Sequence, residues 1–160
     1  MDRILIEGGT PLRGTLAISG SKNAVLPLMV AGLLTDKPVS LRGTPRLADT
    51  RTLANVLREL GAEVEEFGSG PGEGVRVHAH DLSSVRAPYE LVSKMRASFW
   101  VLGPLLARAR KAEVSLPGGC AIGTRPVDRY LSGLAKMGAD MAVEGGYVIA
   151  AARGGLKGAR

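Results

Sequence analysis

Hydrophobic and polar positions along the chain follow two periods, one helical and one extended. Apolar residues at 53, 56, 57 and 60 have the spacing of one helix face, and a glycine follows at 61, where helices commonly end. The segment RGTLAIS at 13–19 alternates as a half-buried strand does. The pattern predicts helices over 24–34, 49–60, 88–111 and 126–137. It predicts strands over 4–6, 12–18, 38–41, 63–67, 74–78, 112–116, 140–143 and 147–151.

The order of these predicted elements repeats once along the chain. Each copy consists of helix, strand, helix, strand and strand, and the end of the second helix matches most clearly. Leu57, Leu60, Gly61 and Ala62 correspond, at one constant offset, to Leu134, Met137, Gly138 and Ala139. Recurrence at this length indicates supersecondary units that share a core, with the loops of each unit collected on one side. The sequence therefore predicts an α/β (α+β) fold built from two related units.

Composition narrows the class of protein and of ligand. The 160 residues include one cysteine and carry a net charge of +6, and the N-terminus has no signal or transit pattern, so a reducing cytoplasm is expected. The longest apolar run, 24–34, is too short to cross a bilayer, so we expect no membrane contact. Basic residues are scattered among acidic ones and aromatic residues are few. This pattern favours small phosphorylated ligands over nucleic acid as the anionic partner.

Polar residues stand where two of the predicted helices begin. The segment GSKN at 20–23 precedes the first apolar run, with Ser21 as a plausible N-cap. Lys22 beside the free N–H groups of a helix start suits an anion, although an ordinary capped helix with a solvated lysine has the same pattern. Arg125 and Asp128 flank a proline at the start of the last helix, which predicts a second anion-binding helix end.

The only cysteine of the chain lies in the segment SLPGGCAIGTRPVD at 115–128. Glycines on both sides of Cys120 make the segment unsuitable for a regular helix or strand. A mobile loop that brings a nucleophile or an acid to a substrate has this composition. A lone cysteine is also commonly a small buried hydrophobic residue, and the segment alone leaves both interpretations open.

Three other polar residues have less specific surroundings. His78 and His80 are two residues apart on a predicted strand and share one face, but no further ligands occur at metal-site spacing. We therefore expect polar residues at a strand end and no metal site. Arg96 lies among apolar residues, and it either reaches solvent from a core helix or enters a cleft at a helix start.

Three motifs in one order carry a resemblance to a known family. They are GSKNA at 20–24, APYELVSKMRAS at 87–98 and SLPGGCAIGTRPVD at 115–128. Together they closely resemble the UDP-N-acetylglucosamine 1-carboxyvinyltransferases, the enolpyruvyl transferases that open peptidoglycan synthesis. The related 5-enolpyruvylshikimate-3-phosphate synthases share the repeats, but Asn23 and the GGCAIG segment are similar to the sugar-nucleotide branch. The resemblance covers the whole chain and implies repeated βαβαββ units in an inside-out α/β barrel, incomplete here.

The resemblance implies a reaction without a metal or other cofactor. The enolpyruvyl group of phosphoenolpyruvate passes to the 3-hydroxyl of UDP-N-acetylglucosamine by addition and then elimination, and phosphate is released. Lys22 matches the lysine that contacts phosphoenolpyruvate, and Asn23 matches the asparagine that contacts the sugar nucleotide. Arg96 and Arg125 match two arginines of the phosphate and diphosphate environment, a task suited to a planar and permanently charged side chain.

The third motif supplies the chemistry in this resemblance. Cys120 matches the loop cysteine that donates a proton, forms an adduct with phosphoenolpyruvate and is alkylated by fosfomycin. Pro126, Val127 and Asp128 match the segment that lines the uridine site.

The chain is shorter than members of this family, which have two domains of three units each. We expect residues 1–20 to form strands that pair with the absent second domain. Residues 21–160 would form a partial first domain of about two units, 21–80 and 87–153. The chain is then the N-terminal part of the enzyme and is inactive without the C-terminal domain. The alternative is a non-catalytic module that binds a sugar nucleotide or nucleic acid through its positive charge.

Overall fold

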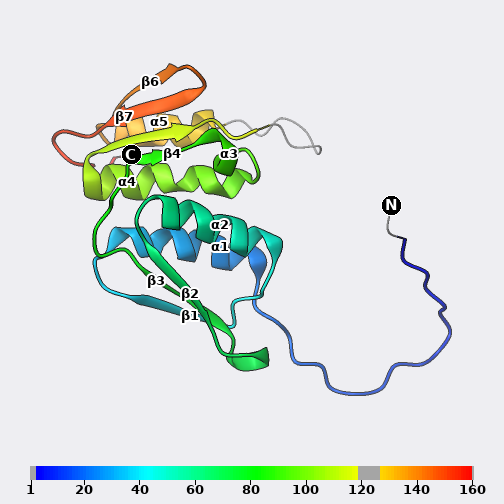
Figure 1. Cartoon of the computed structure of the whole chain (residues 1–160). Helices are drawn as coiled ribbons and strands as arrows, with labels where there is room; N and C mark the ends of the chain where they lie inside the picture. Colours follow the sequence, from blue (N-terminus) through cyan, green and yellow to red (C-terminus); the bar gives the residue numbers. More distant parts are fainter. Residues whose placement is uncertain (1–2, 119–126, 160) are drawn as a thin grey trace.

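The computed structural model describes residues 3–118 and 127–159, and it contains two units of similar topology (Figure 1). The first unit opens with helix α1 (Lys22–Ala31), which continues into the 3-10 turn η1 (Gly32–Leu34). It continues with β1 (Val39–Arg42), α2 (Ala48–Glu59), β2 (Glu63–Phe67), the turn η2 (Gly70–Gly72) and β3 (Gly74–His78). The predicted strand 38–41, helix 49–60 and hairpin 63–78 are therefore confirmed, with boundaries within one residue.

The second unit begins with three short elements and then follows the same order. These elements are β4 (Arg86–Ala87), α3 (Tyr89–Val92) and the 3-10 helix η3 (Arg96–Val101). They are followed by α4 (Leu102–Ala109), β5 (Lys111–Ser115), α5 (Asp128–Lys136), β6 (Asp140–Glu144) and β7 (Tyr147–Ala151).

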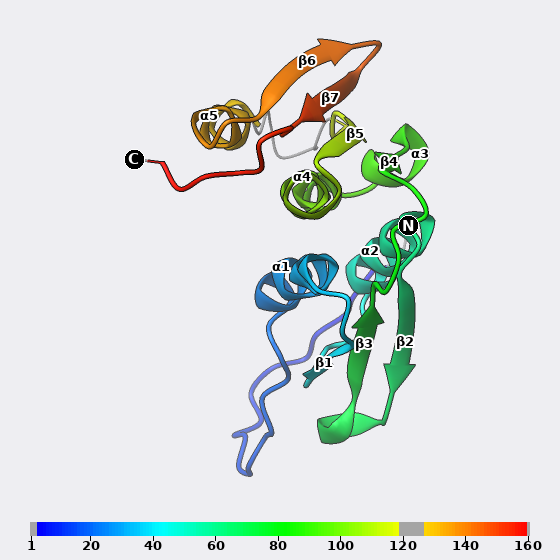
Figure 2. The ribbon, with the colours of Figure 1, turned by 90° about the vertical axis from the view of Figure 1, so that its left-hand side faces the viewer.

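Each unit forms its own sheet, and the strand order is shared. The first sheet has the order β1-β3-β2 and the second β4-β5-β7-β6. All pairings are antiparallel except the short parallel pair between β4 and β5. Helices α1, α2 and α4 lie between the two sheets, so the helices are inside and the sheets outside (Figures 1 and 2). This arrangement is consistent with an incomplete inside-out α/β domain.

The second helix of each unit ends in the same way. Gly61 and Gly138 adopt the left-handed conformation, with φ of 99° and 95°. In both units the next residue donates a backbone hydrogen bond back into the helix, Ala62 to the Leu57 carbonyl at 3.0 Å and Ala139 to the Leu134 carbonyl at 3.1 Å. This is the Schellman-type ending that glycine permits at little steric cost. The internal repeat seen in the sequence is therefore a structural repeat.

The core between the sheets is aliphatic around a single phenylalanine. Phe99 is 1% exposed, and the helices that surround it supply long apolar side chains that are almost completely buried. These are Met29, Leu33, Leu53, Leu57, Leu102, Leu105 and Leu106. They come from both units, so neither unit encloses its own core. Burial of this shared apolar surface is the main force that holds the units together.

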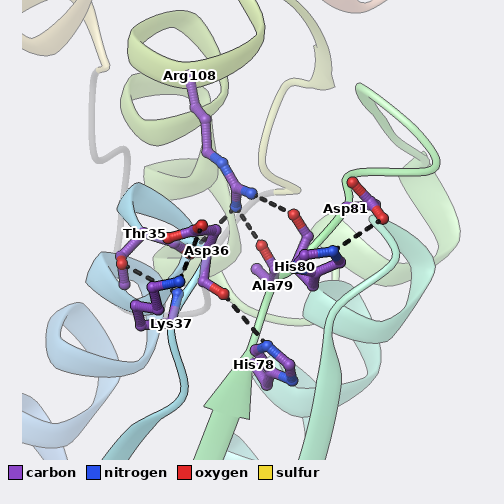
Figure 3. Close-up of polar contacts among 8 residues, drawn as sticks. All are labelled: Thr35, Asp36, Lys37, His78, Ala79, His80, Asp81 and Arg108. Atoms are coloured by element: carbon purple, nitrogen blue, oxygen red, sulfur yellow. Dashed lines mark hydrogen bonds and ion pairs between the residues drawn. The ribbon is translucent and has the colours of Figure 1, made fainter.

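Arg108, in the last turn of α4, makes a polar connection between the units (Figure 3). One guanidinium nitrogen donates to the carbonyls of Leu33 and Thr35, each at 3.2 Å, and to that of Ala79. The other donates to the carbonyl of His80 at 2.6 Å. The Leu33 carbonyl lies in η1, and those of Thr35, Ala79 and His80 directly follow η1 or β3, where the backbone leaves regular structure and needs other donors. Arg108 thus fastens the second unit to two chain segments of the first.

The strands predicted over 4–6 and 12–18 do not form in this chain, while the pairing of residues 1–20 with a second domain stays a prediction. Residues 3–20 contain no helix or strand, and their apolar side chains are exposed, Ile4 to 88% and Leu16 to 89%. Figure 1 shows this segment as an extended arm away from both sheets. A two-stranded hairpin is marginal unless further strands or a packed apolar face support it. The alternating pattern was present, but the arm packs on no apolar face in the described structure.

The helix predicted over 88–111 is interrupted. Met95 is extended, with φ of −157° and ψ of 126°, and it separates α3 from η3 and α4.

The prediction that His78 and His80 share a strand is also wrong, because β3 ends at His78. Their rings are 5.9 Å apart at the end of the strand, where polar residues were expected. Among the described helices, none is long and apolar enough to span a membrane.

Candidate substrate-binding site

The start of α1 has the geometry that its sequence predicts. Ser21 is the N-cap, with extended backbone angles, and its hydroxyl accepts a hydrogen bond from the backbone N–H of Ala24 at 3.4 Å. Lys22 and Asn23 follow as the first two helical residues, and both are exposed to solvent. The N-cap prediction is confirmed. Both side chains are accessible to a ligand beside the positive end of the helix dipole.

Lys22 forms an ion pair that the sequence did not indicate. Its ammonium lies 2.8 Å from a carboxylate oxygen of Asp49, in the first turn of α2. The two side chains are 47% and 37% exposed, so the pair contributes little to stability. Its effect is on position, because Asp49 holds the ammonium between the starts of α1 and α2. An ammonium has three donors, and a single carboxylate contact leaves donors for a second anion.

Arg96 lies at the start of a helical segment. It is the first residue of η3, directly after the extended Met95, and it is half-buried. The structure thus agrees with the interpretation of Arg96 as a residue at a helix start. Arg96 therefore does not extend from the middle of a core helix.

The second and third motifs are in contact where β5 ends. Gly118 packs on Ser93, and a Cβ atom added to this glycine would lie 3.0 Å from the Ser93 carbonyl oxygen. Ser115 is 1% exposed, and the N–H of Leu116 donates to the Gly146 carbonyl at 2.8 Å. The chain that leads from β5 toward the cysteine segment is therefore held against the turn that precedes Arg96.

The far end of the third motif is described from residue 127 onward. Val127 is half-buried and precedes α5, and Asp128 is the exposed first residue of that helix. An acidic residue in the first turn is favourable next to the helix dipole. Cys120, Arg125 and Pro126, three of the residues expected in the site, lie outside the described residues.

The described site residues belong to helix starts and to the end of one strand. Figure 1 shows the start of α1 and the end of β5 on the same side of the molecule. The ion pair joins α1 to α2, and the contact of Gly118 with Ser93 joins the last two motifs. In residues 3–118 and 127–159, no group of three or more His, Cys, Asp and Glu side chains is placed to hold a metal ion.

Similarity to curated proteins covers nearly all of the chain. It is 57% identical over 165 aligned residues to the UDP-N-acetylglucosamine 1-carboxyvinyltransferase of Rhodopseudomonas palustris strain BisB18. It is 54% identical to the protein of the same name from Afipia carboxidovorans. Each alignment covers 99% of this chain but 38% of the relative, so the chain spans the N-terminal part of longer proteins.

Solved structures agree on the fold. The enolpyruvyl transferase NikO from Streptomyces tendae superposes with a TM-score of 0.73 at 24% identity, over 91% of this chain and 31% of NikO. EPSP synthase from Acinetobacter baumannii superposes with a TM-score of 0.59 at 18% identity, over 85% of this chain and 31% of that protein. The family model of EPSP synthase (3-phosphoshikimate 1-carboxyvinyltransferase) matches residues 6–160. The repeated fold, the motifs and this match together show that the chain belongs to the EPSP synthase family.

Proposed function

We propose that this chain forms one wall of the substrate cleft in a UDP-N-acetylglucosamine 1-carboxyvinyltransferase. The observation that supports this most directly is the 57% identity to a transferase of that name over 99% of the chain, which includes all three motifs. The reaction would transfer the enolpyruvyl group of phosphoenolpyruvate to UDP-N-acetylglucosamine. The proposal includes a cytoplasmic location and a place in peptidoglycan synthesis.

The chemistry requires an anion site and a proton donor. In the addition step the sugar hydroxyl oxygen bonds to C2 of phosphoenolpyruvate and loses its proton, while an acid protonates C3. In the elimination step a proton leaves C3 and the C2–O bond to phosphate breaks, which restores the double bond and releases phosphate. Positive charge near the phosphate and carboxylate stabilises the charge that develops in both steps.

Lys22 would bind phosphoenolpyruvate at the start of α1. Its ammonium is oriented by Asp49 at 2.8 Å, and Lys22 is the first residue of the helix. An incoming phosphate would take the remaining ammonium donors, and the backbone dipole would add to the attraction. Asn23, one residue further on the same exposed turn, would contact the sugar nucleotide.

Residues of the second and third motifs would bind the other phosphate groups, donate the proton and contact the uridine. Arg96, at the start of η3, and Arg125 would hold phosphate and diphosphate oxygens. Cys120 would be the acid that protonates C3. The uridine would lie along Pro126, Val127 and Asp128, where α5 begins.

Transferase activity tests the proposal in a chimera. Residues 1–160 are joined to the C-terminal part of the Rhodopseudomonas palustris transferase, hereafter the full-length chimera, and phosphate release is measured. We expect release that depends on UDP-N-acetylglucosamine, and no release by the chain alone. Lys22→Ala should lower kcat/KM at least about 100-fold, as loss of one transition-state donor does. The control is Lys37→Ala, since Lys37 is 80% exposed and is paired with its neighbour Asp36 at 3.5 Å. A chimera without activity would contradict the proposal.

Fosfomycin tests the role of the thiol separately. With the sugar nucleotide present, intact mass spectrometry of the full-length chimera should show one fosfomycin adduct on Cys120. Cys120→Asp should lose the adduct and keep transfer activity, because a carboxylic acid can also donate a proton. Absence of the adduct in the parent chimera, or alkylation of the Cys120→Asp variant, would remove Cys120 from the mechanism.

A further inference from the structure

Tyr130, in the first turn of α5, makes two hydrogen bonds to another part of the second unit. Its phenol donates to the backbone carbonyl of Trp100 at 3.1 Å. The same oxygen accepts from the backbone N–H of Gly103, also at 3.1 Å. Trp100 belongs to η3 and Gly103 to the first turn of α4. One side chain thus joins α5 to the junction of two other helices.

Packing supports these hydrogen bonds. The Tyr130 ring meets Phe99 edge to face, with ring centroids 6.0 Å apart and planes at 65°. Phe99 is 1% exposed, so the tyrosine is fixed to the core of the molecule. Burial raises the pKa of the Tyr130 phenol above its ordinary value, while the Gly103 N–H opposes this effect. The phenol is therefore neutral at physiological pH and available both as donor and as acceptor.

The two ends of this contact lie close in sequence to candidate site residues. Arg96 opens η3, about one turn before Trp100, and Asp128 opens α5, two residues before Tyr130. Within α5, Leu134 is the one buried residue, and it lies toward the other end of the helix. The start of α5 therefore depends on Tyr130 and on half-buried neighbours for its position.

We propose that Tyr130 is a positioning residue for the sugar nucleotide, which holds Val127 and Asp128 at a fixed place relative to Arg96. This inference rests on the proposed function, because it assigns the start of α5 to nucleotide binding. Tyr130 touches no substrate in this proposal, and it acts through the helix start. Its removal should weaken ground-state and transition-state binding of the nucleotide alike and leave the chemical steps unchanged.

The direct test is Tyr130→Phe in the full-length chimera, which removes the phenol oxygen and keeps the ring. We expect KM for UDP-N-acetylglucosamine to rise about fivefold, the effect of losing roughly one net hydrogen bond. The turnover number kcat and KM for phosphoenolpyruvate should change less than about twofold. A residue with only a structural role would lower the melting temperature without this selective change in one KM.

Tyr147→Phe is the matched control. The Tyr147 phenol also accepts a hydrogen bond from a backbone N–H, that of Tyr89 at 3.2 Å, but it lies in β7 and does not contact α5 through this bond. We expect KM for the sugar nucleotide to stay within about twofold of the parent, within the spread of neutral substitutions.

Gly103 allows a second test from the other side of the contact. A Cβ atom at this position would lie 2.6 Å from the Tyr130 phenol oxygen but 3.7 Å from the ring carbon that carries it. Gly103→Ala should therefore displace the tyrosine and raise the same KM, whereas in the Tyr130→Phe background it should add little. Alanine is a better helix residue than glycine, so a general helix defect is not expected. This double-mutant cycle isolates the contact itself.

The possible results separate the two proposals. A full-length chimera without activity contradicts the transferase function, and with it this inference. An active parent in which Tyr130→Phe and Gly103→Ala both keep the parental KM for UDP-N-acetylglucosamine overturns the inference alone. A fall in kcat with no change in that KM also overturns it. If either variant fails to fold, the other still measures the contact.

Discussion

The second helices of the two units, α2 and α5, have the same place in the topology but very different surroundings. Five residues of α2 are buried, whereas one residue of α5 is. Helix α2 packs on its own sheet and also against α3 and η3 of the second unit, while α5 has fewer neighbours. Closely related sequence patterns thus give the same helix and the same glycine ending. How many residues of each helix are buried depends on which other elements pack against it. A helix with one packed face needs additional anchors, and Tyr130 is such an anchor.

The connections before these helices differ as well. Residues 43–47 join β1 to α2, while 116–127 join β5 to α5 and contain most of the third motif. The shorter connection leads to Asp49, which pairs with Lys22. The longer one holds Cys120. In the proposed cleft the two units therefore contribute different parts, an oriented cation from the first and the segment with the proposed acid Cys120 from the second.

The largest expected effect concerns Arg108, which connects the two units. Arg108→Ala removes a guanidinium that donates to four backbone carbonyls, and we expect a loss of about 3 kcal/mol in the free energy of unfolding. The urea transition should also broaden, because the units would unfold less cooperatively. Arg51→Ala, at an exposed position on α2, is the control and should cost less than about 0.5 kcal/mol. A loss below 1 kcal/mol for Arg108→Ala would mean that the shared apolar core alone couples the units.

A smaller effect is the difference in stability cost between alanine substitutions at the two helix-ending glycines, Gly61 and Gly138. Alanine at either position is strained by the positive φ, at about 1 kcal/mol. At Gly61 the new Cβ would also lie 2.6 Å from the backbone nitrogen of Ser83, whereas at Gly138 the nearest atom is 3.9 Å away. We expect Gly61→Ala to cost about 3 kcal/mol and Gly138→Ala about 1 kcal/mol in urea denaturation. Equal losses would show that the units respond alike in spite of their different neighbours.

The smallest effect is the contribution of Tyr130 to the pH dependence of the free energy of unfolding. Its pKa in the folded chain is raised by burial, so the folded state holds this proton more tightly than the unfolded state does. The contribution is complete below the ordinary tyrosine pKa of about 10 and is lost as the pH rises through the folded value. The parent should therefore lose more stability than Tyr130→Phe between pH 8 and 11. Parallel stability curves for the two proteins would argue against a buried phenol.

Much of the local structure could be predicted because it depends on neighbours in sequence. The N-cap at Ser21, the hairpin of β2 and β3, and the glycine endings of α2 and α5 each follow from a short pattern. The repeat was detected in the same way. The prediction failed for the arm before α1, where an alternating pattern has no packed face in the described structure. A strand needs a partner strand, and local pattern does not supply one.

The sequence predicts the motif residues of the candidate site but not the residues that hold them in position. The sequence proposes Lys22, Arg96 and the start of α5 as site residues, because these residues belong to recognisable motifs. It did not indicate Asp49 or Tyr130. Each acts through a contact with a segment far away in sequence, and no local signal distinguishes either from an ordinary helix residue.

The sequence by itself determined most of the elements after residue 20, their repetition and the family that the chain resembles, because periodicity, caps and motifs are local properties. Only the tertiary structure decided which distant residues the motifs contact. It placed the Lys22 ammonium beside Asp49, Gly118 against Ser93 and the Tyr130 phenol on the start of α4. These contacts join residues brought together by burial of a shared core, and such long-range proximity is set by packing rather than by local preference.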